Sequence, residues 1–266
     1  MYRIKLSLLF CISIVTVQLL EAQKLDSSKT FMHTIDSTHL KTDWNYTHQN
    51  KFPIKQLILP GAMIAYGFTT LGNEELQEVN AEVKDEVYAE KPHTTTNIDN
   101  YLQFVPAAAV YALNAVGIKG KNNFRDRTMI YTMSNIIMGT TVYTLKKTTH
   151  QIRPDGSSYT SFPSGHTAEA FASAEFLFQE YKDVSIWYGI AGYAVAATTG
   201  YLRLYNNKHW LGDVVAGAGI GIASTKVSYW LYPKLKRLIF KDKAMHTIVM
   251  PTYRDGSFGV GMVHQF

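Results

Sequence analysis

Cysteine is almost absent from this sequence, and charged residues are sparse. The single cysteine, Cys11, lies in an apolar N-terminal stretch. One cysteine forms no internal disulfide, and if that stretch is removed no thiol remains for a cysteine nucleophile or a cysteine-ligated zinc. Charged residues make up 18% of the sequence and apolar residues 46%. This composition is poor in charge for a soluble domain, yet it is not that of an obvious polytopic membrane protein.

A basic run interleaved with aromatic residues is also missing, so the sequence does not predict nucleic-acid binding. The N-terminus instead has the pattern of an export signal. Arg3 and Lys5 precede an apolar stretch over 6–20, and a polar region follows. The stretch is short for a membrane span, which needs about 20 residues. We predict a signal peptide at 1–22, cleaved near Ala22, with an uncleaved anchor helix as the alternative.

A helical domain is predicted from residue 56 onward, after a polar leader at 23–55. Its apolar segments are rich in small residues and lack period-two alternation, which favours helices. An amphipathic surface helix is expected within 73–92. The main helices are predicted at 56–72, 103–118, 128–147, 164–181, 185–203 and 209–232. We therefore expect an all-α, compact six-helix bundle over 56–232.

The C-terminal residues 233–266 have a different pattern. A basic segment is followed by two short apolar runs on either side of Asp255-Gly256, which is a typical hairpin turn. One hairpin cannot close a barrel, so we expect a hairpin-like tail appended to the bundle.

Two polar clusters lie at predicted helix ends. The first is Lys146 followed by Arg153-Pro154, and the second is Ser164-Gly165-His166, directly before an apolar helix. Free amides and the positive end of the dipole make a helix N-terminus a good anion site. Taken singly, both clusters have structural explanations: a basic helix C-terminus stabilised by the dipole, and a serine N-cap beside a surface histidine.

The third cluster is Arg203, His209 and Asp213. If 209–213 is helical, the histidine and the aspartate share a face, so that the carboxylate fixes which imidazole nitrogen can attack. A structural histidine–aspartate pair is the alternative. Together the three clusters supply three cations, an amide cradle and two histidines, which are the parts that phosphoryl transfer needs. They predict phosphate ester hydrolysis in which His209 attacks phosphorus and His166 protonates the leaving group.

The pattern Lys-x6-Arg-Pro, Pro-Ser-Gly-His and Arg-x5-His-x3-Asp resembles the type 2 phosphatidic acid phosphatase (PAP2) superfamily, which includes bacterial class A acid phosphatases and vanadium haloperoxidases. The resemblance implies a phosphatase without metal or other cofactor, with His209 as nucleophile, Asp213 as its partner and His166 as general acid. The implied phosphate-binding residues are Lys146, Arg153, Ser164, Gly165 and Arg203. The family often has serine where this chain has Leu202, so one hydroxyl contact to phosphate is expected to be missing.

Three other readings are disfavoured. A metal-dependent hydrolase would need ligands, but the sequence has no His-x3-His and no carboxylate cluster beside His166 or His209. A vanadate-dependent haloperoxidase would use nearly the same pocket, but the haloperoxidases of this family are usually much larger. A lipid-binding or scaffold protein with a decayed site would lack a catalytic residue, and none is missing.

The expected substrate is a phosphorylated membrane lipid: phosphatidic acid, phosphatidylglycerol phosphate, undecaprenyl diphosphate or lipid A. The segments 103–118, 128–145 and 185–202 are at the lower limit of length for spanning. If the core spans, the basic residues of 119–127 and those after Tyr232 lie inside and the motifs outside, as the positive-inside rule expects. With a cleaved signal and six spanning helices the motifs would face the cytoplasm, so either helix 56–72 does not cross or the bundle does not span. We predict an exported, membrane-associated enzyme whose site faces the periplasm. A soluble periplasmic acid phosphatase acting on small phosphoesters is the alternative.

Overall fold

Capping residues set the limits of the long helices. The computed structural model describes residues 54–90, 94–240, 247–254 and 257–264. Ser164 and Ser185 are the N-caps of α7 (Gly165–Tyr181) and α8 (Ile186–Tyr205), and each side chain accepts a hydrogen bond from a first-turn amide. Asn123 does the same for α6 (Phe124–Thr149), which ends at His150 in left-handed backbone.

The all-α character of the described residues between 54 and 240 is confirmed. The other helices are α2 (Ile54–Thr69), α3 (Glu74–Lys84), a π-helical turn (Asp85–Ala89), α4 (Asp99–Leu102), α5 (Val105–Ala115) and α9 (Leu211–Phe240). The described residues thus hold eight α-helices: α3 lies within the expected surface helix at 73–92, and α4 is one more than the six main helices expected. α4 was missed because four residues are too few to show a helical period.

The chain divides into two units, Met1–Tyr229 and Trp230–Phe266. In the second unit β1 (Thr247–Arg254) pairs antiparallel with β2 (Ser257–His264). The expected turn residues Asp255-Gly256 lie outside the described residues, as do the predicted signal peptide and all but the last two residues of the predicted leader.

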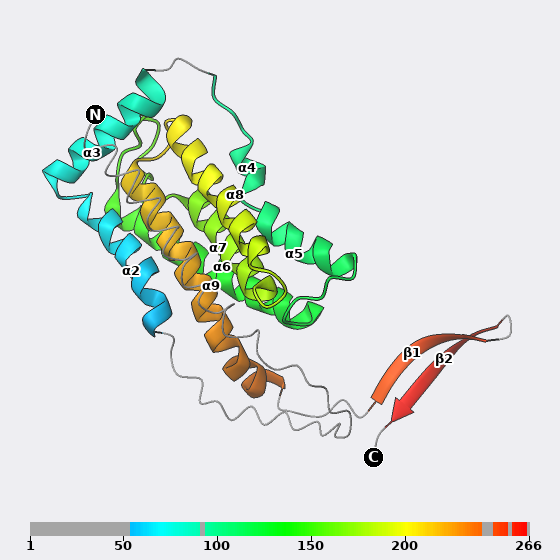
Figure 1. Ribbon diagram of the computed structural model, residues 1–266. Coiled ribbons are helices and arrows are strands. Elements are labelled where there is room, and N and C mark those ends of the chain that lie inside the picture. Colours follow the sequence, from blue (N-terminus) through cyan, green and yellow to red (C-terminus); the bar gives the residue numbers. More distant parts are fainter. Residues whose placement is uncertain (1–53, 91–93, 241–246, 255–256, 265–266) are drawn as a thin grey trace, which may run out of the picture. The chain divides into compact units, whose positions relative to one another are not determined.

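α7 is the central helix of the first unit. Twelve of its 17 residues are buried, and it lies beside α5, α6 and α8 (Figure 1). The close approach of α8 depends on small residues, because a side chain at Gly192 would come within 3.0 Å of Leu177 on α7. The start of α7, which carries one of the predicted motifs, is therefore held inside the bundle.

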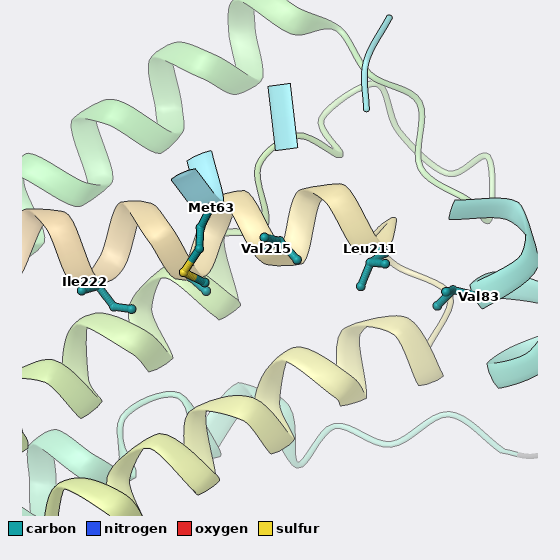
Figure 2. Close-up of a cluster of buried hydrophobic side chains, with 6 residues drawn as sticks. Met63, Val83, Leu211, Val215 and Ile222 are labelled. Atoms are coloured by element: carbon teal, nitrogen blue, oxygen red, sulfur yellow. The ribbon is translucent and has the colours of Figure 1, made fainter. Parts of the chain in front are cut away.

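α9 packs against α2 and α3 through an apolar stripe. The residues of the stripe recur every three or four positions, and one buried residue of α2 and one of α3 lie in the same cluster (Figure 2). Its members are Leu211, Val215, Ala218 and Ile222, and they pack with Met63 and Val83. This packing fixes the N-terminal end of α9, which carries Asp213.

The lengths and hydropathies of the helices bear on whether any of them could span a membrane. Within the described ranges, none of the helices is both long enough and apolar enough to cross a membrane.

Candidate active site

The His209–Asp213 pair lies at the start of α9. Asp213 is in the first turn, whereas His209 precedes the helix, which begins at Leu211. The prediction of a helix from 209, with both side chains on one helix face, is therefore wrong; the turn before α9 brings them together. His209 Nδ1 lies 3.5 Å from Asp213 Oδ2, which is beyond the usual hydrogen-bond range. Both side chains are almost fully buried.

Asp213 is held by two donors that sequence reasoning missed. Trp210 N donates to Asp213 Oδ2 at 2.9 Å, and the Ser161 hydroxyl donates to the same oxygen. Hydrogen bonds to an ionised carboxylate are stronger than those between neutral groups, so these two fix the carboxylate that faces His209. Ser161 is 52 residues away in the sequence, and no periodic or spacing signal links it to Asp213.

The Ser164-Gly165-His166 motif forms the N-terminal turn of α7, as predicted. The Ser164 hydroxyl is turned toward Thr167, whose amide and hydroxyl lie 3.4 and 2.8 Å from it. Ser164 N donates to the Asp213 carbonyl oxygen at 3.0 Å, which joins the second and third motifs. The amides of Gly165 and His166 belong to the first helical turn and therefore have no intrahelical acceptor.

Lys146 lies in the last turn of α6, and its ammonium reaches the loop that follows. Lys146 Nζ donates to the Thr160 carbonyl oxygen at 2.5 Å and lies 3.4 Å from that of Ser161. The same loop carries Arg153, whose amide donates to the Ser158 carbonyl oxygen at 2.9 Å. The first motif is thus two cations on a folded loop beside the start of α7.

Three contacts tie this loop to neighbouring elements. Trp210 Nε1 donates to the Ile152 carbonyl oxygen at 2.8 Å. Lys208 pairs with Asp155 at 2.7 Å. Lys84 of α3 donates to the Pro154 carbonyl oxygen at 3.2 Å. The residues beside His209 therefore also position Arg153, which the motif spacing alone did not indicate.

Arg203, in the last turn of α8, forms a buried ion pair with Asp99 of α4. Both side chains are buried, with exposed fractions of 7% for Arg203 and 1% for Asp99. Arg203 uses Nη1 for this pair, while its Nε is buried without a hydrogen-bond partner among the described residues. The two residues are 104 positions apart in the sequence, so nothing in the motif pattern pointed to Asp99.

Asn100, which follows Asp99 in α4, contacts the second motif. His166 Nε2 lies 2.8 Å from Asn100 Oδ1. This contact joins α4 to the start of α7 and was also missed from the sequence, because it links residues 66 positions apart through a helix too short to predict.

The charges of the motifs act together on His166. Burial and the neighbouring Arg203, Arg153 and Lys146 together lower the pKa of His166 to about 4, against the raising effect of Asp99. The structure therefore brings all three predicted cations to one histidine.

Burial also lowers the pKa values of His209 and Lys146. Burial lowers the pKa of His209 to about 4, against the raising effect of Asp213. Burial and the neighbouring Arg153 lower the pKa of Lys146 to about 8. In the part of the chain that the structure describes, no group of three His, Cys, Asp or Glu side chains could hold a metal ion.

Comparison with known sequences identifies the domain. The sequence pattern of the PAP2 superfamily matches residues 127–237. Residues 127–237 form a PAP2 superfamily domain. The matched region of the PAP2 domain includes all eight predicted site residues but ends short of Asp99 and Asn100 on its N-terminal side.

One relative shares more than the motifs. A lipid A 1-phosphatase of Porphyromonas gingivalis is 37% identical to this chain over 163 residues, which cover 61% of this chain. The match spans only 36% of the relative's own length.

Two solved structures are similar in fold. The crystal structure of Aquifex aeolicus LpxE has 22% sequence identity and a TM-score of 0.44, covering 57% of this chain and 94% of that one. A transmembrane PAP2 type phosphatidylglycerolphosphate phosphatase from Bacillus subtilis has 18% identity and a TM-score of 0.47, covering 70% of this chain and 98% of that one.

Proposed function

We propose that this protein hydrolyses phosphate monoester or diphosphate groups through a phosphohistidine intermediate. The observation that carries the proposal is a set of buried donors without acceptors. Arg153 Nε and Arg203 Nε are buried and unpaired among the described residues, close to the free amides at the start of α7. An unpaired buried donor costs about 1–3 kcal/mol. A phosphate group has several acceptor oxygens and a negative charge, so it can bind all of these donors at once.

On the attacking side, His209 is the nucleophile and Asp213 orients it. The pKa of about 4 keeps His209 neutral near pH 7, and a neutral imidazole has the lone pair that attack on phosphorus requires. Because Asp213 faces Nδ1, Nε2 is the attacking nitrogen. Lys146, Arg153 and Arg203, with the free amides of Gly165 and His166, stabilise the charge on the phosphate oxygens.

On the leaving side, His166 is the general acid. Its pKa of about 4 without substrate would leave it unprotonated near pH 7. A phosphate dianion beside it favours the charged imidazolium and raises its pKa. Substrate binding therefore lets His166 take a proton from solvent, which it then gives to the departing alkoxide.

The substrate class that we propose is a phosphorylated membrane lipid. The relative named lipid A 1-phosphatase, 37% identical over 163 residues, supports lipid A phosphate as the first candidate. Exposed apolar side chains on and beside α4, next to Asp99 and Asn100, also favour a lipid. They are Ile98, Tyr101, Phe104 and Val105. Soluble phosphoesters remain the alternative.

The location and the domain limits are part of the proposal. We infer an exported protein with a signal peptide at 1–22, a leader at 23–55, the phosphatase domain at 56–232 and a tail at 233–266. We propose that the domain is associated with the membrane and that its site faces the periplasm, as expected for an enzyme that acts on lipid phosphates of the cell envelope.

Matched histidine variants test the mechanism. His209→Asn removes the nucleophile, whereas His150→Asn changes an exposed histidine at the end of α6, in left-handed backbone that asparagine tolerates. Phosphate release would be measured in EDTA, with and without vanadate, from lipid A in mixed micelles and from p-nitrophenyl phosphate.

We expect vanadate-sensitive release by the wild-type protein and by His150→Asn, and a loss of at least about a thousandfold in His209→Asn, because covalent catalysis is removed. Release that requires a metal, or that survives in His209→Asn, would contradict the mechanism. Faster turnover of p-nitrophenyl phosphate than of lipid A would favour the soluble phosphatase.

A further inference from the structure

The short helix α4 brings two consecutive side chains to the motifs, although it lies outside the matched PAP2 region. Asp99 pairs with Arg203, and Asn100 contacts His166. One short segment therefore reaches both a proposed phosphate ligand and the proposed general acid.

The segment is fastened to the end of α8. Asn206, the C-cap of α8, accepts from Thr96 N at 3.0 Å and donates to the Thr96 carbonyl oxygen at 2.8 Å. Asn206 Nδ2 also lies 3.4 Å from Asp99 Oδ2. Asp99 and Asn206 are both buried. Because buried polar contacts are costly to break, they hold Asn100 in a defined place over His166.

The chemistry of the Asn100 contact restricts the histidine. The amide oxygen only accepts, so His166 Nε2 must carry a proton to make the 2.8 Å hydrogen bond. With Nε2–H engaged, Nδ1 is the nitrogen left to gain a proton and to give it away. An amide is uncharged, so it sets the tautomer and the ring orientation without holding the imidazolium in its charged form, as a carboxylate would.

We propose that Asn100 is a positioning residue for the phosphatase reaction: it fixes the tautomer and orientation of His166, and the Asp99–Arg203 ion pair anchors the segment that presents it. This inference rests on the proposed role of His166 as general acid. The proton that leaves with the alkoxide comes from Nδ1, while Nε2–H stays bonded to Asn100.

The proposal predicts a pH effect from one isosteric change. His166 already lies among Arg203 from α8, Arg153 from the loop, Lys146 from α6 and Asp99 from α4. Asn100→Asp adds a carboxylate in direct contact, which favours imidazolium and raises the pKa of His166. A general acid works only while protonated, so the alkaline limb of the kcat profile should move to higher pH by about one unit or more.

The experiment compares wild type, Asn100→Ala, Asn100→Asp and the control Asn97→Ala in the full-length protein. Asn97 is an exposed residue of the same segment. We expect Asn100→Ala to lower kcat by about tenfold or more with little change in KM, because the general acid is mispositioned. Asn97→Ala should match wild type. The ring ¹⁵N shifts of His166 should report the Nε2–H tautomer in wild type and a mixture of tautomers in Asn100→Ala.

The outcomes separate the two proposals. If His209→Asn abolishes activity while Asn100→Ala keeps the wild-type kcat, pH profile and tautomer, the role of Asn100 is overturned and the mechanism stands. If Asn97→Ala loses as much activity as Asn100→Ala, the effect comes from the segment's folding and the inference also fails. Activity that does not depend on His209 overturns the proposed function, and this inference with it.

Discussion

At the scale of single residues, the proposed nucleophile depends on neighbours that hold its partner. The Asp213 carboxylate accepts from the Trp210 amide and the Ser161 hydroxyl on the same oxygen that faces His209. Ser161 is fully buried, so its hydroxyl has no water to replace this bond. The orientation of His209 therefore depends on a serine that belongs to none of the three motifs.

Ser161→Ala tests this dependence. Loss of a buried hydrogen bond to a carboxylate should lower the free energy of unfolding by about 1.5–3 kcal/mol, and a less constrained Asp213 should lower kcat by about tenfold. Urea denaturation and initial rates would measure both. Ser157→Ala is the control, since Ser157 lies in the same loop but is exposed and should change stability by less than about 0.5 kcal/mol. Equal effects of the two substitutions would refute the role of Ser161.

At the scale of elements, α7 is buried on most sides yet carries carboxylates that are paired inside the bundle. Glu175 pairs with Lys226 of α9 at 2.9 Å, and Glu180 accepts from Asn122 and from Tyr229. Removing one partner from such a pair leaves a buried charge uncompensated, which is strongly destabilising. These contacts hold the C-terminal half of α7, whereas α9 packs closely on the N-terminal turn of α7 at Gly217.

The packing of α9 on α7 makes a prediction at Gly217. A Cβ there would lie 2.5 Å from the Ser164 carbonyl oxygen, so Gly217→Ala must push apart the two helices that carry the second and third motifs. We expect a loss of about 1–3 kcal/mol in the free energy of unfolding and a clear fall in kcat. In Gly139→Ala, the control in α6, the added methyl meets nothing within 4 Å and should be neutral or gain about 0.5–1 kcal/mol. A fully active Gly217→Ala protein would argue against a site shared by the two helices.

At the scale of the whole molecule, the buried His209 couples stability to pH. The pKa of His209 falls from 6.5 to about 4 on folding. Between these values the unfolded chain binds a proton that the folded chain does not. The free energy of unfolding should therefore fall as the pH drops from about 6.5 to about 4, with a slope of at most about 1.4 kcal/mol per pH unit from this group.

Urea denaturation at pH 7, 6, 5 and 4.5 would measure that slope. His209→Asn removes the titrating group, so its stability should depend less on pH than that of the wild type over this window. His150→Asn should keep the wild-type slope, because His150 is exposed. A wild-type slope that persists in His209→Asn would show that other groups carry the effect.

The exposed apolar side chains around α4 lead to a prediction about binding of the protein to a lipid surface. Tyr101 of α4 and Phe104, the N-cap of α5, have exposed fractions of 76% and 50%. Replacing both with serine should lower the rate on lipid in vesicles by about tenfold, because burial of aromatic surface in the bilayer is lost, and leave the rate on p-nitrophenyl phosphate unchanged. An equal fall on both substrates would count against lipid docking and would place the defect in the site.

Much of the site could be predicted from the sequence, because its three motifs are local. Each motif lies at a helix boundary that capping residues and proline mark. Phosphoryl transfer needs cations, amides and histidines together, which is why motifs far apart in the chain were assigned to one site. The all-α domain was likewise predictable from apolar segments without period-two alternation. These features are set by neighbouring residues, so the sequence alone determined them.

Only the tertiary structure decided which other residues contact the motifs of the candidate site. Ser161, Asp99 and Asn100 contact the motifs across 52 to 104 positions of sequence, and no periodicity encodes such pairs. It also decided that His209 precedes α9, since the turn before Leu211 is set by packing against α2 and α3. The lowered pKa values of both histidines arise the same way. Burial and the convergence of charges from several helices exist only once the chain has folded.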